Sequence, residues 1–217
     1  MKKIISFSLW GDNPKYTIGA IRNAELTPII FPGWTSRFYC GKSVPNDIIK
    51  TLVSLPDTEV IMMEVDGDWT GMFWRFYACE DSDIMLSRDT DSRLSNREKL
   101  AVDEWLESDK DFHIMRDHPY HNTEILGGMW GVRNGLLNNI KLLINEYVKG
   151  DFWQVDQNFL KQIIYPIVTD KSFIHDSYLS YNINSKKFPS ERINREFVGD
   201  VFDENDIRHP DYYKFIK

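Results

Sequence analysis

The segment IMLSRDTD, residues 84–91, places two aspartates directly behind a short apolar run. Short apolar runs of this kind are typical of buried strands. Side chains two positions apart in an extended chain face the same side, so the carboxylates of Asp89 and Asp91 are expected side by side just beyond the strand. Ligands of open α/β sheets bind beyond the carboxyl ends of the strands. The segment therefore predicts an α/β fold with a binding site at this point.

Strand-like and helix-like segments alternate around it through the first two thirds of the 217 residues. This alternation predicts one α/β domain, with a mixed, mostly parallel central sheet flanked by helices. Strands are expected over residues 3–10, 36–40, 60–65, 84–86 and 112–115, with a glycine-rich strand before residue 131. Helices are expected over residues 16–24, 45–53, 72–79, 95–106, 136–148 and 154–165. Pro28 is expected to end the first helix, and the residues from 169 onward to form a tail that wraps the domain.

The composition limits the partners and the location. The chain carries 33 acidic and 26 basic residues, a formal net charge of −7, without a long basic block. A nucleic-acid backbone is therefore not an expected partner. Nothing approaches the ~20 consecutive apolar residues of a membrane span. Cys40 and Cys79 form no CxxC motif and fit reduced thiols, so a soluble, cytoplasmic protein is expected.

The two aspartates suit a divalent cation. Carboxylate oxygens are hard ligands that bind Mg²⁺ or Mn²⁺, and these ions in turn bridge phosphate oxygens. A solvated acidic turn is the simpler interpretation of an isolated Asp-x-Asp. The apolar strand before it and its place near the middle of an α/β chain favour the metal site.

Further motifs follow in a characteristic order. Trp74-Arg75 precedes the Asp-x-Asp, and Gly127-Gly128-Met129-Trp130-Gly131, Asp156-Gln157 and His175-Asp176 follow it. In this order the sequence resembles the GT-A class of glycosyltransferases, in particular retaining nucleotide-sugar transferases, over residues 1 to 180. It is also similar to the capsid-glycan glycosyltransferases of large DNA viruses. The tryptophan- and lysine-bearing extension that often follows the late histidine in related families has no counterpart here.

The resemblance implies a single GT-A (Rossmann-like) domain and a metal-dependent enzyme. Such an enzyme moves a sugar from a nucleotide-sugar donor, here expected to be a UDP-sugar, to a glycan or glycoprotein acceptor with retention of configuration. Residues 1–92 would form the nucleotide-binding half, residues 93–180 the sugar and acceptor half, and residues 181–217 a C-terminal wrapping tail. The expected cofactor is Mn²⁺ or Mg²⁺.

The resemblance also assigns residues to each part of the site. The metal ligands would be Asp89, Asp91 and His175, and the catalytic pair Asp156 and Gln157. The nucleotide would lie against Ser8, Leu9, Trp10, Gly11, Tyr16, Arg75 and Thr90. The donor or acceptor sugar would lie against Arg88, Asp117, His118, Gly128, Met129 and Trp130.

Each assignment has a structural alternative. The carboxylate of Asp156 would steady positive charge in an oxocarbenium-like transition state, or it is simply favoured at a helix N-terminus. A neutral nitrogen from His175 would favour Mn²⁺ over Mg²⁺, but a lone histidine is also a common hydrogen-bonded residue. Arg75 and Arg88 offer a fork of donors to phosphate or sugar, or they form structural ion pairs. Trp10 is either a base contact or part of the core.

Other functional classes share parts of this pattern. Gly41-Lys42-Ser43 resembles the end of a P-loop, but Ser36 stands where that motif requires glycine. An Asp-x-Asp phosphatase or phosphotransferase has the same aspartate spacing, but Arg93 stands at the fifth position, where Thr or Val is expected. A non-catalytic carbohydrate-binding module could use the tryptophans and a Ca²⁺ in the acidic loop, although it would not need a nucleotide crevice.

Overall fold

The computed structural model describes residues 1–148, 150, 152–178, 182 and 184–216, and these contain one seven-stranded sheet. The strand order is β3-β2-β1-β4-β6-β5-β7. The strands are β1 (Lys3–Leu9), β2 (Thr35–Cys40), β3 (Thr58–Met62), β4 (Ile84–Ser87), β5 (Phe112–Arg116), β6 (Trp130–Arg133) and β7 (Ser172–Asp176). Strand β6 runs antiparallel to both of its neighbours, β4 and β5, whereas the other pairs are parallel. The expected mixed, mostly parallel sheet is confirmed.

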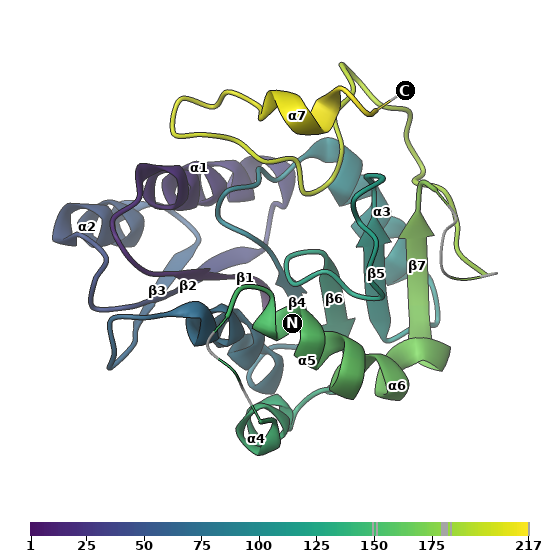
Figure 1. Cartoon of the computed structure of the whole chain (residues 1–217), viewed down its shortest axis with the longest axis horizontal. Coiled ribbons are helices and arrows are strands. Elements are labelled where there is room, and N and C mark those ends of the chain that lie inside the picture. The colour runs from purple at the N-terminus through teal and green to yellow at the C-terminus, as the bar shows by residue number, and fades with distance from the viewer. Residues whose placement is uncertain (149, 151, 179–181, 183, 217) are drawn as a thin grey trace.

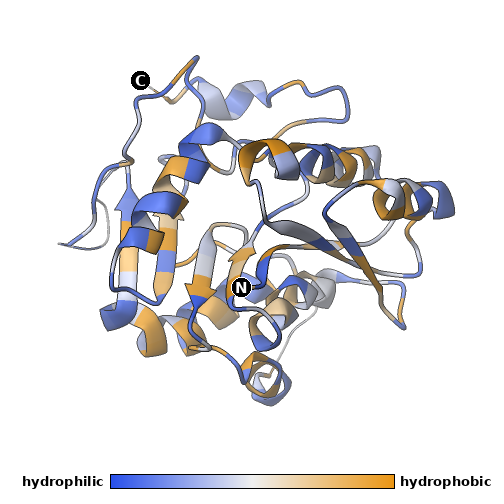
Figure 2. Ribbon diagram, turned by 180° about the vertical axis from the view of Figure 1, so that it is seen from behind, coloured by the Kyte–Doolittle hydropathy of each residue, from blue (hydrophilic) through white to orange (hydrophobic). Residues whose placement is uncertain are grey.

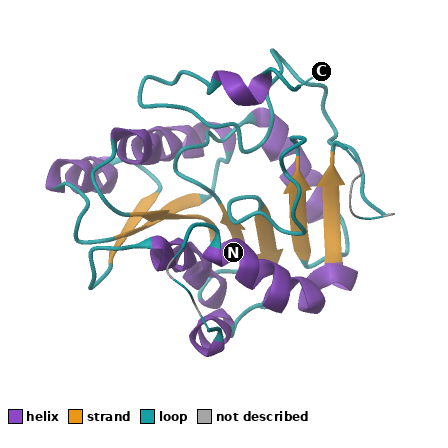
Figure 3. Ribbon diagram, viewed as in Figure 1, coloured by secondary structure: helices purple, strands orange, loops and turns teal. Residues whose placement is uncertain are grey.

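Helices cover both faces of the sheet (Figures 1 and 3). One face carries α1 (Pro14–Ile30), α2 (Asn46–Ser54) and α3 (Asn96–Glu107), which pack on it through one apolar cluster. The other face carries the 3₁₀ helix η1 (Trp69–Glu80), α4 (Ile140–Glu146), α5 (Val155–Phe159), the π-helical turn η2 (Leu160–Ile164) and α6 (Tyr165–Val168), joined by a second cluster. The turn η3 (Thr169–Lys171) leads into β7, and α7 (Pro210–Tyr213) lies in the C-terminal segment.

The strands β1, β2, β4 and β5 are buried along almost their whole length because helices cover both faces of the sheet. Along β1, Ile4 packs into the cluster beneath η1 and α4, whereas Ile5, Phe7 and Leu9 pack beneath α1 and α2. Figure 2 shows the same division, with apolar residues along the strands and polar ones over much of the C-terminal segment. No helix in the described part of the chain is long and apolar enough to cross a membrane.

The order of the strands creates a crevice. From β1 the chain passes to β2 on one side and later returns to β4 on the other, and both β2 and β4 pair in parallel with β1. When the connections on the two sides of a strand run in opposite directions, they diverge at the carboxyl end of that strand. This divergence leaves space there for a ligand. The segment after β4, which begins with Arg88 and Asp89, starts at this place.

Several sequence-based boundaries differ from the structure. Pro28 lies inside α1, which runs on to Ile30, since a proline in the last turn forfeits only one backbone bond and Thr27 Oγ1 donates to Asn23 O at 2.8 Å nearby. The third strand begins two residues earlier than expected and ends at Met62. The helix expected over residues 136–148 is shorter, Ile140–Glu146.

The largest difference concerns the chain after residue 169. It was expected to be a tail, yet Ser172–Asp176 forms β7, the edge strand that pairs with β5. Strand β7 has little apolar alternation to mark it, because its pattern includes a histidine and an aspartate that are buried through ion pairing and hydrogen bonding. Residues 184–216 cross over the carboxyl ends of the central strands (Figure 1).

Candidate active site

A cavity of about 550 Å³ opens at the carboxyl ends of β1 and β4. Its walls come from the loop after β1, the first turn of α1, the helix η1, the segment after β4, the chain around residues 126–129, the start of α5, and the C-terminal segment. Twelve of the sequence-predicted site residues line it: Ser8, Leu9, Trp10, Gly11, Tyr16, Arg75, Asp89, Thr90, Asp91, Met129, Asp156 and Gln157. The crevice predicted from the strand pattern is therefore present, and both aspartates face it.

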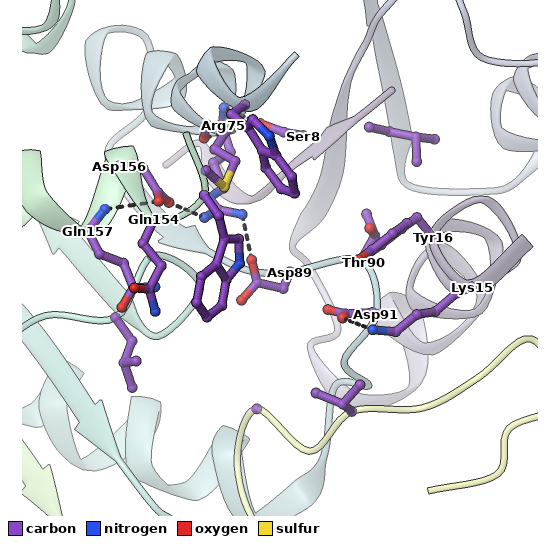
Figure 4. A pocket seen from close by; sticks show the side chains of 18 of the residues that line it. Ser8, Lys15, Tyr16, Arg75, Asp89, Thr90, Asp91, Gln154, Asp156 and Gln157 are labelled. Carbon is purple, nitrogen blue, oxygen red and sulfur yellow. Dashed lines mark hydrogen bonds and ion pairs between the residues drawn. The ribbon is translucent and has the colours of Figure 1, made fainter. Parts of the chain in front are cut away.

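Arg75 joins two carboxylates of the cavity. Its Nη1 lies 2.6 Å from Asp89 Oδ1, and its Nη2 lies 2.7 Å from Asp156 Oδ2 (Figure 4). Arg75 and Asp156 are both buried, whereas the Asp89 side chain is 46% exposed. Burial raises the pKa of Asp156, although the Arg75 charge opposes that shift. The guanidinium thus holds one accessible and one buried carboxylate at fixed positions on the same wall.

Lys15 holds the other aspartate of the motif. Its Nζ lies 2.7 Å from Asp91 Oδ2, reaching from the first turn of α1 (Figure 4). Burial raises the pKa of the Asp91 carboxyl, and the negative charge of Asp89 raises it further. The like charge of Asp89 thus acts against the ionised form of Asp91, whereas the Lys15 charge favours it.

Two glycines allow this arrangement. A Cβ added to Gly128 would collide with the carboxylate of Asp89, and one added to Gly127 would collide with Asp156 and lie 2.5 Å from Arg75 Nη2. The chain at Gly127 is fixed by its carbonyl, which accepts a 2.7 Å hydrogen bond from Ser87 Oγ. Gly128 itself does not line the cavity but makes room for Asp89.

Asp89 and Asp91 fit a divalent cation that also contacts a phosphate. Mg²⁺ and Mn²⁺ prefer oxygen ligands, and Mg²⁺ sites in proteins commonly use one or two carboxylates and leave the remaining positions to water and phosphate. No three His, Cys, Asp or Glu side chains within the described ranges gather into a group that would hold a metal alone. The chemistry of the two carboxylates therefore suits a metal bound together with a phosphorylated ligand.

The end of β1 also lines the cavity. Ser8 Oγ accepts a 3.0 Å hydrogen bond from the Arg75 backbone N–H, so Ser8 positions η1 as well as lining the cavity. The Trp10 ring packs edge-on against Trp74, with centroids 6.1 Å apart, and remains partly accessible. Gly11 has a φ of 72°, which turns the chain toward α1 and Tyr16. Tyr16 is 38% exposed beside Asp91.

Besides Gly128, four predicted sugar contacts, Arg88, Trp130, Asp117 and His118, lie away from the cavity lining. Arg88 is buried in an ion pair with Glu98, and its Nη1 donates to the carbonyl of Trp130 at 2.9 Å. Glu98 is the third residue of α3, and its backbone N–H donates to the hydroxyl of the N-cap residue Ser95 at 3.2 Å. Trp130 stacks on Phe112 in the core at 5.3 Å.

Asp117 and His118 belong to the loop after β5 and hold the C-terminal segment. Asp117 is fully buried between Arg97 and Arg192, each at 2.7 Å. His118 Nε2 lies 2.9 Å from the carbonyl of Tyr212. Both residues act on the wall of the cavity through the segment they anchor.

His175 is separated from the aspartate pair. In β7 its Nδ1 lies 2.8 Å from His113 Nε2 and its Nε2 lies 3.0 Å from Glu104 Oε2. Both ring nitrogens are therefore engaged, and the side chain is completely buried. Because β7 pairs in parallel with β5, the backbone places this histidine beside α3 and not among the residues that line the cavity.

Several lining residues were not anticipated from the sequence. They include Lys15, Trp153, Gln154 and, from the C-terminal segment, Gly199, Val201 and Tyr212. The Phe202 N–H donates to the Asp91 carbonyl at 2.8 Å, so this segment also fixes the loop that carries Asp89 and Asp91. A lysine in a first helical turn and a tryptophan before a helix have no pattern that marks them as site residues. Only their position beside Asp91 and Asp156 does.

No protein-family model matches the sequence, and no curated protein matches it either. Solved structures do match in fold. A glycosyltransferase involved in the glycosylation of the major capsid of PBCV-1 superposes with a TM-score of 0.54 at 16% identity, over 81% of this chain and 82% of that one. The galactosyltransferase LgtC, in complex with donor and acceptor sugar analogs, gives a TM-score of 0.51 at 10% identity, over 83% and 80%.

Glucosyl-3-phosphoglycerate synthase from Mycobacterium tuberculosis is the third similar protein. Its UDP complex gives a TM-score of 0.52 at 12% identity, covering 88% of this chain and 72% of that one. Its complex with Mn²⁺, UDP-glucose and phosphoglyceric acid gives 0.50 at 13% identity, covering 80% and 68%. The expected GT-A fold is thereby confirmed.

Proposed function

We propose that this chain is a metal-dependent glycosyltransferase that moves a sugar from a nucleotide-sugar, a UDP-sugar in the first instance, to a glycan acceptor. The observation that carries the proposal is the pair Asp89 and Asp91 facing one cavity at the carboxyl ends of β1 and β4. The fold is that of glycosyltransferases whose solved complexes contain UDP, UDP-glucose and Mn²⁺. A cavity of about 550 Å³ is within the ordinary range for a small-molecule site.

Asp89 and Asp91 would hold Mn²⁺ or Mg²⁺. When bound, such an ion supplies positive charge against the departing diphosphate. His175 is left out of this ligand set because both of its nitrogens have partners elsewhere. The aromatic rings of Trp10 and Tyr16 lie where the base and ribose of a nucleotide would lie beyond β1.

Asp156 and Gln157 would lie beside the anomeric carbon. Arg75 binds Asp156 at 2.7 Å and so favours its ionised form, although burial raises its pKa. A carboxylate fixed near the reacting carbon steadies the positive charge of an oxocarbenium-like transition state. The proposal includes retention of configuration, with residues 1–92 holding the nucleotide, residues 93–180 the sugar and acceptor, and residues 181–217 closing the site.

The test begins with isothermal titration of UDP with and without Mn²⁺. Metal-dependent UDP binding is expected, and Asp91→Asn should abolish it while leaving the circular dichroism and the thermal midpoint close to those of the wild type. Wild-type transfer by Asp91→Asn in the presence of metal would remove the motif from the mechanism. Thermal stabilisation by a panel of nucleotide-sugars would then identify the donor, and NMR of the first-formed product its stereochemical outcome.

A further inference from the structure

An exposed tryptophan stands at the rim of the cavity. Trp153 lies directly before α5, lines the cavity, and is 66% exposed. Its ring has no aromatic or cation partner within the described part of the chain, unlike Trp10, which packs against Trp74. An exposed aromatic ring at the rim of a cavity offers a flat apolar face on which a ligand can stack.

Two amide side chains adjoin this ring. Gln154 and Gln157 both line the cavity, and Figure 4 shows them on the same side as Asp156. The Gln157 backbone N–H donates to Asp156 Oδ1 at 2.9 Å, whereas neither side-chain amide has a hydrogen-bond partner among the residues described. Gln154 has a φ of 69°, a left-handed conformation that few residues other than glycine adopt.

The combination of an apolar face and unengaged amides is suited to one class of ligand. A pyranose ring offers an apolar face of C–H groups and hydroxyls around its edge, and each hydroxyl both donates and accepts hydrogen bonds. An amide side chain likewise presents one acceptor and two donors. The ring and the amides together match a sugar more closely than they match a flat base or an ion.

The charged side chains that line the cavity disfavour an anionic acceptor. Its lining includes four carboxylates and two cations: Asp12, Asp89, Asp91, Asp156, Lys15 and Arg75. Four negative charges against two positive leave two net negative charges, which one divalent cation would cancel. Burial lowers the pKa of His121 to about 3, so this residue adds no charge near neutral pH. Both cations are already paired with carboxylates, so an anionic acceptor would meet no unpaired cation among the described lining residues.

We propose that Trp153, Gln154 and Gln157 form an acceptor subsite for an uncharged sugar, with the Trp153 ring stacked on the sugar face and the two amides hydrogen-bonded to its hydroxyls. This inference rests on the proposed function, since it places the acceptor beside a donor held at Asp89 and Asp91. It sets this chain apart from the synthase whose complex contains phosphoglyceric acid, an anionic acceptor. A hydroxyl oxygen of the bound sugar would form the new bond to the donor's anomeric carbon as the bond from that carbon to the diphosphate breaks, and the hydroxyl proton would pass to the departing diphosphate oxygen.

Saturation-transfer NMR on the full chain, saturated with UDP and Mn²⁺, tests the subsite. The probes are methyl glycosides and disaccharides of neutral hexoses, together with their uronic-acid and phosphorylated counterparts and 3-phosphoglycerate. Neutral sugars should show transfer, and the charged probes should show little. Preferential binding of the charged probes, or no binding by any neutral sugar at millimolar concentration, would overturn the assignment.

Three variants distinguish an effect on the acceptor subsite from a general loss of the fold. Trp153→Ala should weaken neutral-sugar binding about tenfold, and Trp153→Phe should retain most of it. The matched control is Phe152→Ala, because Phe152 is the adjacent aromatic residue, 43% exposed, and does not line the cavity. Unchanged sugar affinity in Trp153→Ala would overturn the proposal.

UDP titrations on the same samples distinguish the two proposals. All three variants should bind UDP and Mn²⁺ as the wild type does, because Trp153 is assigned to the acceptor alone. Normal UDP binding with no effect of Trp153→Ala on sugar binding would refute only the acceptor subsite. Absence of UDP binding in the wild type would refute the proposed function and, with it, this inference.

Discussion

Lys15 Nζ lies 2.7 Å from Asp91 Oδ2, so a side-chain cation already contacts one carboxylate of the proposed metal site. The two side chains are 32% and 18% exposed. Burial alone would lower the pKa of Lys15, but the charge and hydrogen bond of Asp91, together with smaller contributions from Tyr16 and Tyr212, leave the pKa raised. Lysine and metal would therefore compete for the same oxygen.

Lys15→Ala is accordingly expected to bind Mn²⁺ more tightly than the wild type when no nucleotide is present. A partly exposed ion pair contributes up to about 1 kcal/mol, so the gain should be roughly two- to fivefold. Electron paramagnetic resonance of free Mn²⁺ measures it directly. Lys42→Ala is the control, since Lys42 pairs with Glu64 on the surface, and it should leave the affinity unchanged. An equal or weaker Mn²⁺ affinity in Lys15→Ala would show that the lysine supports the site and does not compete for it.

Alanine at Gly128 and at Gly127 should damage different halves of the site. The new Cβ at position 128 would collide with Asp89, whereas that at position 127 would collide with Asp156 and Arg75. Gly128→Ala should therefore lose most metal-dependent UDP affinity, measured by titration calorimetry. Gly127→Ala should lower stability as well, because it disrupts the buried ion pair. Equal effects of the two variants on both measurements would contradict this division.

Arg75→Met should destabilise the fold by about 3–5 kcal/mol, because removing one member of a buried ion pair leaves an uncompensated charge. The charge in question is that of Asp156, whose side chain is 2% exposed. Urea denaturation at pH 7.5 gives the change in the free energy of unfolding. The double variant Arg75→Met with Asp156→Asn should recover part of the loss, since it removes that charge. A double variant less stable than Arg75→Met would show that Asp156 is stabilised by contacts other than Arg75.

Acidification should destabilise the protein through His113. Burial lowers the pKa of His113 well below its usual 6.5, so the folded state keeps this ring neutral. The neutral His113 ring stabilises the folded state fully above pH 6.5. As the pH falls below that value, the unfolded chain takes up the proton first, so the free energy of unfolding decreases by about 1.4 kcal/mol per pH unit for this one proton.

The measurement is the free energy of unfolding at pH 7.5, 6.5 and 5.5. His113→Phe keeps an aromatic ring next to Trp105, on which His113 stacks at 5.2 Å, and should show a shallower decline between pH 6.5 and 5.5. His209→Phe, outside the core at the start of α7, serves as the control. Parallel pH profiles for the wild type and His113→Phe would exclude His113 as the source.

The amino-acid sequence by itself determined the layered α/β architecture and the place of the crevice. Apolar runs and helical stripes are local patterns, so β1, β2, β4 and β5 lie within two residues of where those patterns predicted them. Asp89 and Asp91 follow their strand directly, and a strand's end is where α/β sheets leave room for ligands. Strand β7 was not predicted from the sequence because its burial depends on partners such as Arg116 and His113, which are about 60 residues away in the chain.

Only the tertiary structure decided which charged groups meet. Arg75 reaches Asp156 across 81 positions of sequence, and Lys15 meets Asp91 because α1 begins where β1 ends, beside the end of β4. His175 occupies the sequence position expected of a late metal ligand. The pairing of β7 with β5, however, directs its side chain toward Glu104. Ion pairs and hydrogen bonds act over a few ångströms and join residues at any separation in the sequence, so no local sequence pattern predicts them.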